Sequence, residues 1–471
     1  MTAVSDYAVI VVGSGFAGLS AALSAAEEDA SVLVVEAEST VGGSSQYSGG
    51  IVMGTQTRQQ KEAGIVDSPD NLFHDYMALN RWKVDAGNVR RIAEEAGHGI
   101  EWLEGLGVRF LDDLFHGGDE QVPRCHVPVG NGAKVVETLY SACRANPHIE
   151  FAFGRRIDRL LVEDGTVVGV AVGDDEVRAS AVVLAMGGFG SNREMLAERC
   201  PDTADAGDWQ WYIGGETAKG DAIAIAEAAG ADISGGQRYL AALGPNIGRS
   251  LVVYFPAWLI IVNPEGRRFY DETAPYSVTQ PLVQYQGGRV FAVFDERAKS
   301  AARAHAPGQT RKDELPSDVI DRIWSSDSID QFVADGAFVK ADTLEELAGI
   351  LGVDAANLQG TVARYNDDAK AGRDSLFLKD PALMTPIETA PFYGAELRLC
   401  AVAVTFIGPR IDPDAHVLRP DTRPIPGLFA AGECTGGVLG DTYVGTGNSV
   451  ANCVVFGRTA GRSAARCAHG R

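Results

Sequence analysis

The sequence of 471 residues predicts an α/β fold in which a domain with a parallel sheet is interrupted by an inserted α+β domain. Three observations support this prediction. The first 36 residues alternate between apolar strand-like segments and an Ala-rich helix-like segment, with a glycine-rich turn between them. Glycine-rich segments return after Pro391, and the stretch between the two glycine-rich parts has denser aromatic residues. We therefore expect one domain built from 1–236 and 388–471, and an inserted cap domain over 237–387.

The opening unit begins with a short apolar run at 8–12, which is typical of a buried parallel strand. The turn Gly-Ser-Gly-Phe-Ala-Gly follows at 13–18, then an Ala-rich helix over 19–28 and a second strand over 31–35 that ends at Glu36. A G-x-G-x-x-G turn between a strand and a helix, with an acid after the next strand, indicates a Rossmann-type dinucleotide-binding unit.

The remaining elements follow from apolar periodicity and turn signals. Strands are predicted at 157–162, 167–172, 182–186 and 428–431, and Asp164-Gly165 predicts a tight hairpin between the first two. Helices are predicted as two weakly capped stretches within 69–106, and at 134–144, 222–229, 317–324, 329–334, 344–349, 355–371 and 449–465.

Charge and cysteine usage exclude several classes of protein. There are 41 Lys and Arg against 63 Asp and Glu, and the net charge of −22 argues against nucleic acid or an anionic membrane as the main partner. The seven cysteines include no C-x-x-C pair, so we expect no metal or iron–sulfur site. Reduced thiols favour a cytoplasmic protein. The apolar run at 7–26 is broken by glycines and lacks a basic flank, so no membrane span is expected.

Each glycine of the first motif has a mechanical role. Gly13 permits the tight turn, Gly15 lets the backbone approach a pyrophosphate, and Gly18 lets the helix pack closely on the strand. The helix N-terminus offers free N–H groups to the phosphate, and Glu36 lies where an acid accepts hydrogen bonds from the adenosine ribose. The residues predicted to bind this half of the cofactor are Gly13, Gly15, Phe16, Ala17, Gly18, Glu36 and Ala37.

Two further glycine loops favour FAD over NAD. One is Gly-Gly-Ser-Ser-Gln-Tyr-Ser-Gly-Gly at 42–50, and the other is Gly-Leu-Phe-Ala-Ala-Gly-Glu at 427–433. No second G-x-G-x-x-G unit is present, so the flavin is expected to exchange electrons with an external acceptor, which is a quinone, oxygen or a carrier protein. The additional residues predicted to bind FAD are Gly43, Ser44, Ser45, Ser48, Gly49, Gly50, Ala185, Gly187, Gly188 and Gly432.

With these loops the chain resembles, over nearly its whole length, the flavoprotein family of fumarate reductase, succinate dehydrogenase and the 3-ketosteroid dehydrogenases. The segments Thr-Ala-Lys-Gly-Asp at 217–221 and Phe-Gly-Arg-Thr-Ala-Gly at 456–461 also look like that family. The resemblance implies that Asp221 and Glu433 bind FAD, with Glu433 holding the ribityl chain. It also implies that the helix start at Asn448, Ser449 and Val450 faces the pyrimidine end of the flavin. Residues 44–50 contain no His, so a His-linked flavin is not expected and FAD is predicted to be non-covalent.

The sequence departs from fumarate reductases at the positions that bind a dicarboxylate. Tyr276 stands where those enzymes have a proton-donating Arg, and Tyr443 stands where they have the Arg of the C-terminal glycine loop. Two phenols cannot replace two guanidinium groups in bidentate carboxylate recognition.

The same two positions look like the 3-ketosteroid Δ1-dehydrogenase branch. Residues 271–276, Asp-Glu-Thr-Ala-Pro-Tyr, resemble its general-base segment, and 443–447, Tyr-Val-Gly-Thr-Gly, resemble its Y-x-G-x-G loop. The resemblance implies that the Tyr443 hydroxyl and the Gly447 N–H hold a ketone oxygen, that Tyr276 removes an α-proton, and that flavin N5 receives a β-hydride. An α-proton is too weakly acidic without a polarised carbonyl, so this chemistry needs both donors.

Three functions remain open on the sequence. The first is an FAD-dependent α,β-dehydrogenase of a cyclic ketone, either a monocyclic cyclohexanone or oxocyclohexanecarboxylate, or a 3-ketosteroid. The compact chain and the segment 448–452, which looks more like fumarate reductases, favour the smaller ketone. The second is a reductase of an enone or enoate, and the third is a non-catalytic carrier on a flavoprotein-like fold. His126 is a further candidate for the site, whereas Arg268 and Arg410 are expected to form structural ion pairs.

Overall fold

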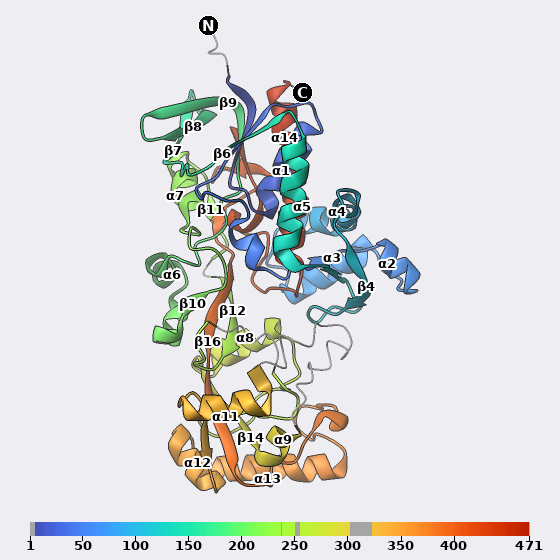
Figure 1. Ribbon diagram of the computed structural model, residues 1–471, viewed down its shortest axis with the longest axis vertical. Coiled ribbons are helices and arrows are strands. Elements are labelled where there is room, and N and C mark those ends of the chain that lie inside the picture. The colour runs from blue at the N-terminus through green and yellow to red at the C-terminus, as the bar shows by residue number, and fades with distance from the viewer. Residues whose placement is uncertain (1–4, 237, 250–254, 302–322, 471) are drawn as a thin grey trace. The chain divides into compact units, whose positions relative to one another are not determined.

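The computed structural model describes residues 5–236, 238–249, 255–301 and 323–470 (Figure 1). The chain divides into two compact units. The first contains Met1–Pro201, Tyr212–Tyr239 and Ala403–Arg471, and the second contains Asp202–Trp211 and Leu240–Val402. The boundaries expected at 236/237 and 387/388 stay a prediction, and residue 237 lies outside the described residues.

The first unit is organised around a mainly parallel sheet of eight strands. Strands β1, β2, β6, β9 and β19 pair in parallel in the order β19-β9-β1-β2-β6, with β18 antiparallel at one edge and the β7–β8 hairpin joined to β9. The predicted strands and the hairpin at Asp164 and Gly165 are therefore confirmed. The bounds are β1 Tyr7–Val12, β2 Val32–Val35, β6 Ile149–Ala152, β7 Arg159–Glu163, β8 Thr166–Val172, β9 Asp175–Leu184, β18 His416–Leu418 and β19 Pro424–Ala430.

Helices α1 (Phe16–Ala26) and α14 (Asn448–Ala468) pack closely against each other beside this sheet (Figure 1). A Cβ on Gly457 would lie 2.5 Å from the Ala17 carbonyl oxygen, and one on Gly461 would lie 2.2 Å from that of Ala21. Since the two contacts follow the same order along both helices, α1 and α14 are parallel. The remaining helices of this unit are α2 Arg58–Glu62, α3 Pro69–Leu79, α4 Ala86–Gly105, α5 Asn131–Ala145, α6 Arg193–Arg199 and α7 Asp221–Ala228.

Smaller strands and turns complete the first unit. Strands β3 (Val52–Met53), β5 (Cys125–Pro128) and β4 (Phe110–Phe115) form an antiparallel sheet, and β11 (Ile233–Ser234) pairs with β17 (Gly408–Pro409). Short 3-10 helices cover Gly43–Tyr47 and Gly432–Cys434.

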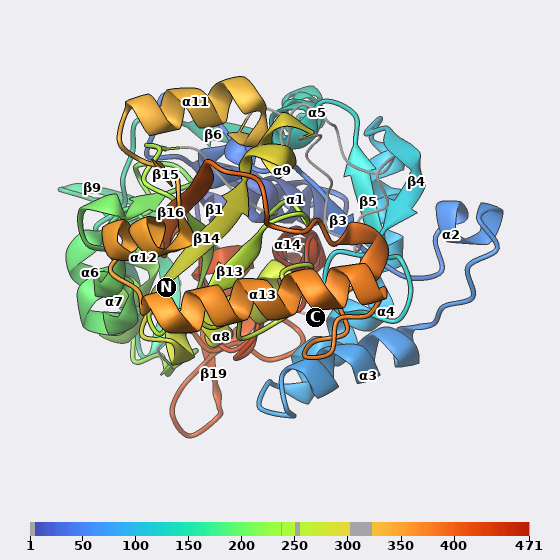
Figure 2. The same ribbon diagram turned by 90° about the horizontal axis from the view of Figure 1, so that it is seen from below.

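The second unit contains a six-stranded sheet centred on the long strand β16 (Phe392–Thr405), which pairs antiparallel with β14 (Arg289–Asp295) and β15 (Val339–Ala341). Helix α13 (Ala355–Ala371) passes across β13 (Ile260–Val262) and β14 (Figure 2), and apolar side chains from all three share one buried cluster. The other elements are β10 Trp211–Tyr212, β12 Tyr239–Gly244, α8 Tyr276–Tyr285, α9 Glu296–Ser300, α11 Ser326–Ala334 and α12 Leu344–Leu351, with 3-10 helices at Pro201–Trp209 and Pro381–Leu383. Apart from its last two residues, the helix expected at 317–324 lies outside the described residues.

The expectation of weak caps within 69–106 is wrong. The Ser68 side chain accepts a hydrogen bond from Asn71 N–H at 3.1 Å, and the Asp85 carboxylate accepts one from Asn88 N–H at 3.0 Å. Both side chains therefore satisfy a backbone donor that the first turn of α3 or α4 leaves open.

We expect Asp85→Ala to lower the free energy of unfolding by about 1 kcal/mol, because Ala cannot accept the Asn88 N–H bond. Urea unfolding of the holoprotein measures the change. Asp85→Asn retains an acceptor and serves as the matched control. Equal stability of the Ala and Asn variants would show that the cap contributes nothing.

Candidate cofactor and substrate site

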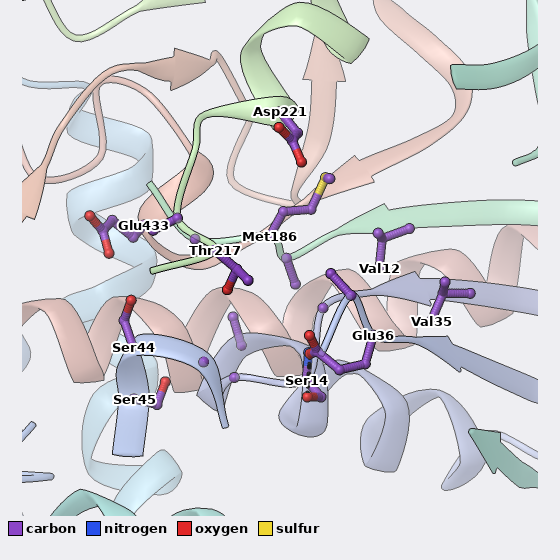
Figure 3. A pocket seen from close by; sticks show the side chains of 18 of the residues that line it. Val12, Ser14, Val35, Glu36, Ser44, Ser45, Met186, Thr217, Asp221 and Glu433 are labelled. Atoms are coloured by element: carbon purple, nitrogen blue, oxygen red, sulfur yellow. Dashed lines mark hydrogen bonds between the residues drawn. The ribbon is translucent and has the colours of Figure 1, made fainter. Parts of the chain in front are cut away.

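A partly open pocket lies in the first unit at the carboxyl ends of its parallel strands. Figure 3 shows Val12 and Val35, the last residues of β1 and β2, beside Ser14 and Glu36, with Met186 and Thr217 nearby. Ligands of doubly wound sheets bind at such carboxyl ends.

The pocket collects residues from loops far apart in the sequence. The predicted cofactor residues that line it are Gly13, Gly15, Phe16, Ala17, Glu36, Ala37, Gly43, Ser44, Ser45, Ala185, Gly187, Asp221 and Glu433. The predicted residues that are not part of its lining are Gly18, Ser48, Gly49, Gly50, Gly188, Gly432, Asn448, Ser449 and Val450. The lining also includes residues that the sequence prediction did not name, among them Ser14, Arg155, Arg156, Met186 and Cys453.

The first turn leaves room for backbone and not for side chains. Gly13 has a φ of +101°, and a Cβ there would lie 2.3 Å from the Ala185 carbonyl oxygen. A Cβ on Gly18 would lie 1.9 Å from the Gly13 carbonyl oxygen, which is how α1 starts so close to the strand. A cradle of this kind fits a diphosphate, because it brings N–H groups and a helix N-terminus to the ligand.

We expect Gly13→Ala to weaken FAD binding at least tenfold, since the new methyl group must displace the loop that carries Ala185. Reconstitution of the apoprotein, followed by flavin fluorescence, measures the dissociation constant. Gly64→Ala is the matched control, because nothing lies within 4 Å of its Cβ position, its φ of +69° is positive as well, and Gly64 is not part of the pocket lining. Wild-type affinity in Gly13→Ala would contradict this placement of the cofactor.

The Glu36 carboxylate is fixed by the turn that it faces. Glu36 is 6% exposed, and its Oε2 accepts hydrogen bonds from the Ser14 N–H at 2.9 Å and from the Ser14 hydroxyl. Its Oε1 accepts the Glu38 N–H at 2.9 Å. Ser14 therefore orients the acid, and its position inside the G-x-G motif was the signal available in the sequence.

At the other end of the pocket, Glu433 is held by groups from three distant segments. Its Oε1 accepts from Thr405 N–H at 3.0 Å and from the Thr405 hydroxyl at 3.1 Å. The Tyr212 hydroxyl lies 3.5 Å from Oε2 and 3.0 Å from the Ser44 hydroxyl. Burial raises the pKa of the Glu433 carboxyl above its ordinary value. Gly188 packs against this group, since a Cβ on it would lie 2.0 Å from Thr405 Oγ1.

Arg155 and Arg156 bring positive charge to the pocket, although the net charge of the whole chain is −22. They follow β6, and Arg156 contacts both carboxylate oxygens of Asp221, at 2.9 and 2.7 Å. The sequence prediction omitted them because no motif marks them. Their place after a strand that joins the parallel sheet was the signal that could have found them.

Tyr443 is fixed at the start of α14. It is 6% exposed, its hydroxyl donates to the Ser449 hydroxyl at 3.0 Å, and the same oxygen accepts the Ser449 N–H at 3.1 Å. Its ring stacks on Phe406 with centroids 6.1 Å apart. Burial raises the pKa of Tyr443 to about 12, so the phenol stays protonated at neutral pH.

Gly447 is the N-cap residue that precedes α14, with a φ of +89°. Its carbonyl accepts the Met53 N–H at 3.2 Å, and a Cβ on it would lie 2.6 Å from that nitrogen. Neighbouring Asn448 is fully buried and donates to the Tyr76 hydroxyl at 3.1 Å. The loop 443–449 is therefore determined by backbone contacts that only glycine permits at 447.

Tyr276 belongs to the second unit, where it is half-buried and begins α8. Glu272, four residues earlier, lies in a fully buried ionic cluster with Arg268, Asp374 and Lys379. Arg268 donates twice to the Glu272 carboxylate, each time at 2.8 Å, and Lys379 donates to it at 2.9 Å. The structural role expected for Arg268 is confirmed, and the cluster anchors the segment that leads to Tyr276.

Two other candidates have structural roles. His126 is fully buried between β3 and β4, its Nε2 lies 2.8 Å from the Thr57 hydroxyl, and burial lowers its pKa to about 4. Arg410 pairs with Asp232 at 2.8 Å, as expected. Across 5–236, 238–249, 255–301 and 323–470, no three His, Cys, Asp or Glu side chains gather as a metal site.

The model of the FAD binding domain matches residues 8–450 of the chain. The chain belongs to this family. A probable fumarate reductase of Shewanella frigidimarina is 32% identical over 97% of this chain and 74% of its own. A urocanate reductase of Eggerthella lenta is 31% identical over 98% and 75%. The structure of a 3-ketosteroid-Δ4-(5α)-dehydrogenase from Rhodococcus jostii is 28% identical, with a TM-score of 0.80 over 99% of this chain and 98% of that one.

These matches confirm the α/β FAD-binding fold, the cofactor FAD and the resemblance to fumarate reductases and ketosteroid dehydrogenases. The protein is an FAD-dependent oxidoreductase of this family, so the hypothesis of a non-catalytic carrier is wrong. The non-covalent attachment and the cytoplasmic location stay predictions. Among the described residues, no helix has the length and apolar character needed to cross a bilayer.

Proposed function

We propose that this oxidoreductase desaturates a cyclic ketone between its α- and β-carbons and passes the electrons to an external acceptor. The observation that carries the proposal is the environment of Tyr443. Its phenol is buried, neutral and hydrogen-bonded at the N-terminus of α14, four residues before Gly447. A neutral phenol donates to a ketone oxygen but offers no charge to a carboxylate.

The Ser449 N–H makes the Tyr443 hydroxyl a better donor. It donates to the phenol oxygen from the first turn of α14, where the helix carries partial positive charge. A hydroxyl that accepts such a bond is polarised toward giving its own proton to a second acceptor. When the Tyr443 O–H turns from the Ser449 hydroxyl to the substrate, it and the Gly447 N–H would stabilise the negative charge that develops on the ketone oxygen as the α-proton leaves.

In this proposal Tyr276 is the general base that removes the α-proton. Its phenol must ionise to act as a base, and the ordinary pKa of about 10 makes this a costly step near neutrality. When bound, FAD supplies the oxidant that accepts the β-hydride. Proton and hydride leave from adjacent carbons, and the substrate becomes the conjugated enone.

Two substrate classes remain within this proposal, a monocyclic ketone and a 3-ketosteroid. The compactness of the chain does not separate them, because the Rhodococcus ketosteroid enzyme has nearly the same length in the comparison. The monocyclic ketone is therefore supported only by the segment 448–452, and both classes belong in the test.

Turnover with an artificial electron acceptor tests the reaction. Cyclohexanone, 4-oxocyclohexanecarboxylate and a 3-ketosteroid are supplied separately, and the product is analysed by mass. A product two hydrogens lighter that absorbs as an enone is the expected result. Reduced acceptor without enone would contradict desaturation.

The second candidate is a reductase of an enone or enoate. It is favoured by the names of the relatives at 31–32% identity, a fumarate reductase and a urocanate reductase. Dithionite-reduced enzyme mixed anaerobically with fumarate, urocanate and cyclohexenone distinguishes it. Rapid flavin oxidation by enoates, with no reaction of saturated ketones, would establish this candidate in place of the desaturase.

A further inference from the structure

Glu120 is a buried carboxyl group that neither the cofactor pocket nor the proposed chemistry uses. It is 7% exposed and lies in the loop after β4. Its Oε1 accepts the N–H of Gly117, while its Oε2, also buried, has no hydrogen-bond partner among the described residues. A buried polar atom left unpaired costs free energy, so its retention calls for an explanation.

The backbone that Glu120 holds is paired directly with the loop 443–447. The Gly117 carbonyl accepts the Thr446 N–H at 2.9 Å, and Gly118 forms an antiparallel bridge with Gly445. The Cys125 thiol donates to the Thr446 carbonyl at 2.9 Å. Three contacts therefore fix the loop between Tyr443 and Gly447 from one side.

The two glycines permit no other packing at this contact. A Cβ on Gly117 would lie 2.4 Å from the Cys125 sulfur, and one on Gly118 would lie 2.3 Å from the Val444 carbonyl oxygen. The segment 117–118 thus touches the loop 443–447 through bare backbone. Any shift of Gly117 or Gly118 is transmitted to the loop, because close-packed backbone cannot absorb it.

We propose that Glu120 is a positioning residue, which holds Gly117 and Gly118 in place so that the loop 443–447 keeps its two donors aimed at the substrate oxygen. The inference rests on the proposed function for the identity of that oxygen. Burial raises the pKa of the Glu120 carboxyl, against the opposing effects of the Gly117 and Gly118 N–H groups and of Arg124. Burial thus disfavours a charged carboxylate at this position, and the hydrogen bond to Gly117 offsets part of that cost.

Hydrogen exchange of the FAD-loaded protein tests the positioning directly. In Glu120→Ala we expect the Thr446 amide to exchange about tenfold faster, because the bond that anchors its acceptor segment is lost. Glu120→Gln keeps an oxygen acceptor for Gly117 and should restore slow exchange. Asp119→Ala, one residue earlier and exposed, is the matched control and should behave as wild type.

Kinetics supply the second readout. We expect kcat/KM for the ketone to fall about tenfold in Glu120→Ala and to recover in Glu120→Gln, with unchanged FAD content in both. If Glu120→Ala does not fold, Glu120→Asp replaces it, since Asp keeps the charge but is one methylene short of Gly117. Wild-type exchange at Thr446 in the folded Ala or Asp variant would overturn the inference. Faster exchange in a protein that oxidises no ketone would instead leave Glu120 as a positioning residue and overturn the proposed function.

Discussion

Tyr276→Phe is expected to lower ketone turnover by about 10²- to 10⁴-fold, the contribution typical of a general base, while FAD remains bound. Phe keeps the ring that begins α8 and removes only the hydroxyl that would take the α-proton. The cofactor pocket contains no residue of this helix, so its occupancy should not change. Tyr285→Phe is the matched control, because Tyr285 ends the same helix and is 88% exposed.

Deuterium exchange at the ketone α-carbon isolates the proton step from flavin reduction. The wild-type enzyme should release deuterium from the α-carbon of the labelled ketone into solvent. Tyr276→Phe should release it much more slowly. If Tyr276→Phe turns over the ketone as fast as Tyr285→Phe does, Tyr276 is not the base.

Tyr443→Phe is expected to lower kcat/KM by about 10²- to 10³-fold, the loss observed when one oxyanion donor is removed. The variant keeps the stacking partner Phe406 but removes the only side-chain donor of the proposed pair, and it leaves the Ser449 N–H without its acceptor. Tyr140→Phe is the control, since Tyr140 lies on α5 and packs against Phe151 instead.

The pH dependence of ketone binding tests whether Tyr443 acts as a neutral donor. Because burial raises the pKa of Tyr443 to about 12, its hydroxyl is protonated at neutral pH and loses the proton only in strongly alkaline solution. Ketone binding should therefore show no loss from this group below about pH 10, the ordinary pKa of tyrosine. An alkaline decline in ketone affinity near neutrality that disappears in Tyr443→Phe would contradict a neutral donor.

The sequence was most informative where the structure is set locally. The turn at Gly13 and Gly18 and the acid Glu36 follow from a few adjacent residues, and the structure has the expected tight turn and close helix start. The loop 443–447 was predicted instead from its resemblance to the Y-x-G-x-G loop of the 3-ketosteroid dehydrogenases. What could not be predicted is the partner of Tyr443 within that loop, because the hydroxyl bond to Ser449 depends on the backbone path through Gly445 and Gly447.

Contacts between distant segments were the part that sequence reasoning could not supply. Arg155 and Arg156 line the pocket because β6 pairs with β2, a neighbour more than a hundred residues earlier in the chain. Glu120 holds the segment that contacts the loop 443–447 through the bridge between Gly118 and Gly445, and no local sequence pattern indicates this contact. Such contacts depend on strand order, which periodicity alone does not reveal.

Anaerobic mixing of the oxidised holoenzyme with saturated cyclic ketones is the most direct test of the proposed reaction. No electron acceptor is present, so one turnover can only reduce the bound flavin. We predict that cyclohexanone, 4-oxocyclohexanecarboxylate or a 3-ketosteroid bleaches the flavin absorbance with one enone formed per flavin. If all three leave the flavin oxidised while enoates rapidly reoxidise the reduced enzyme, the protein is a reductase and the desaturase proposal is wrong.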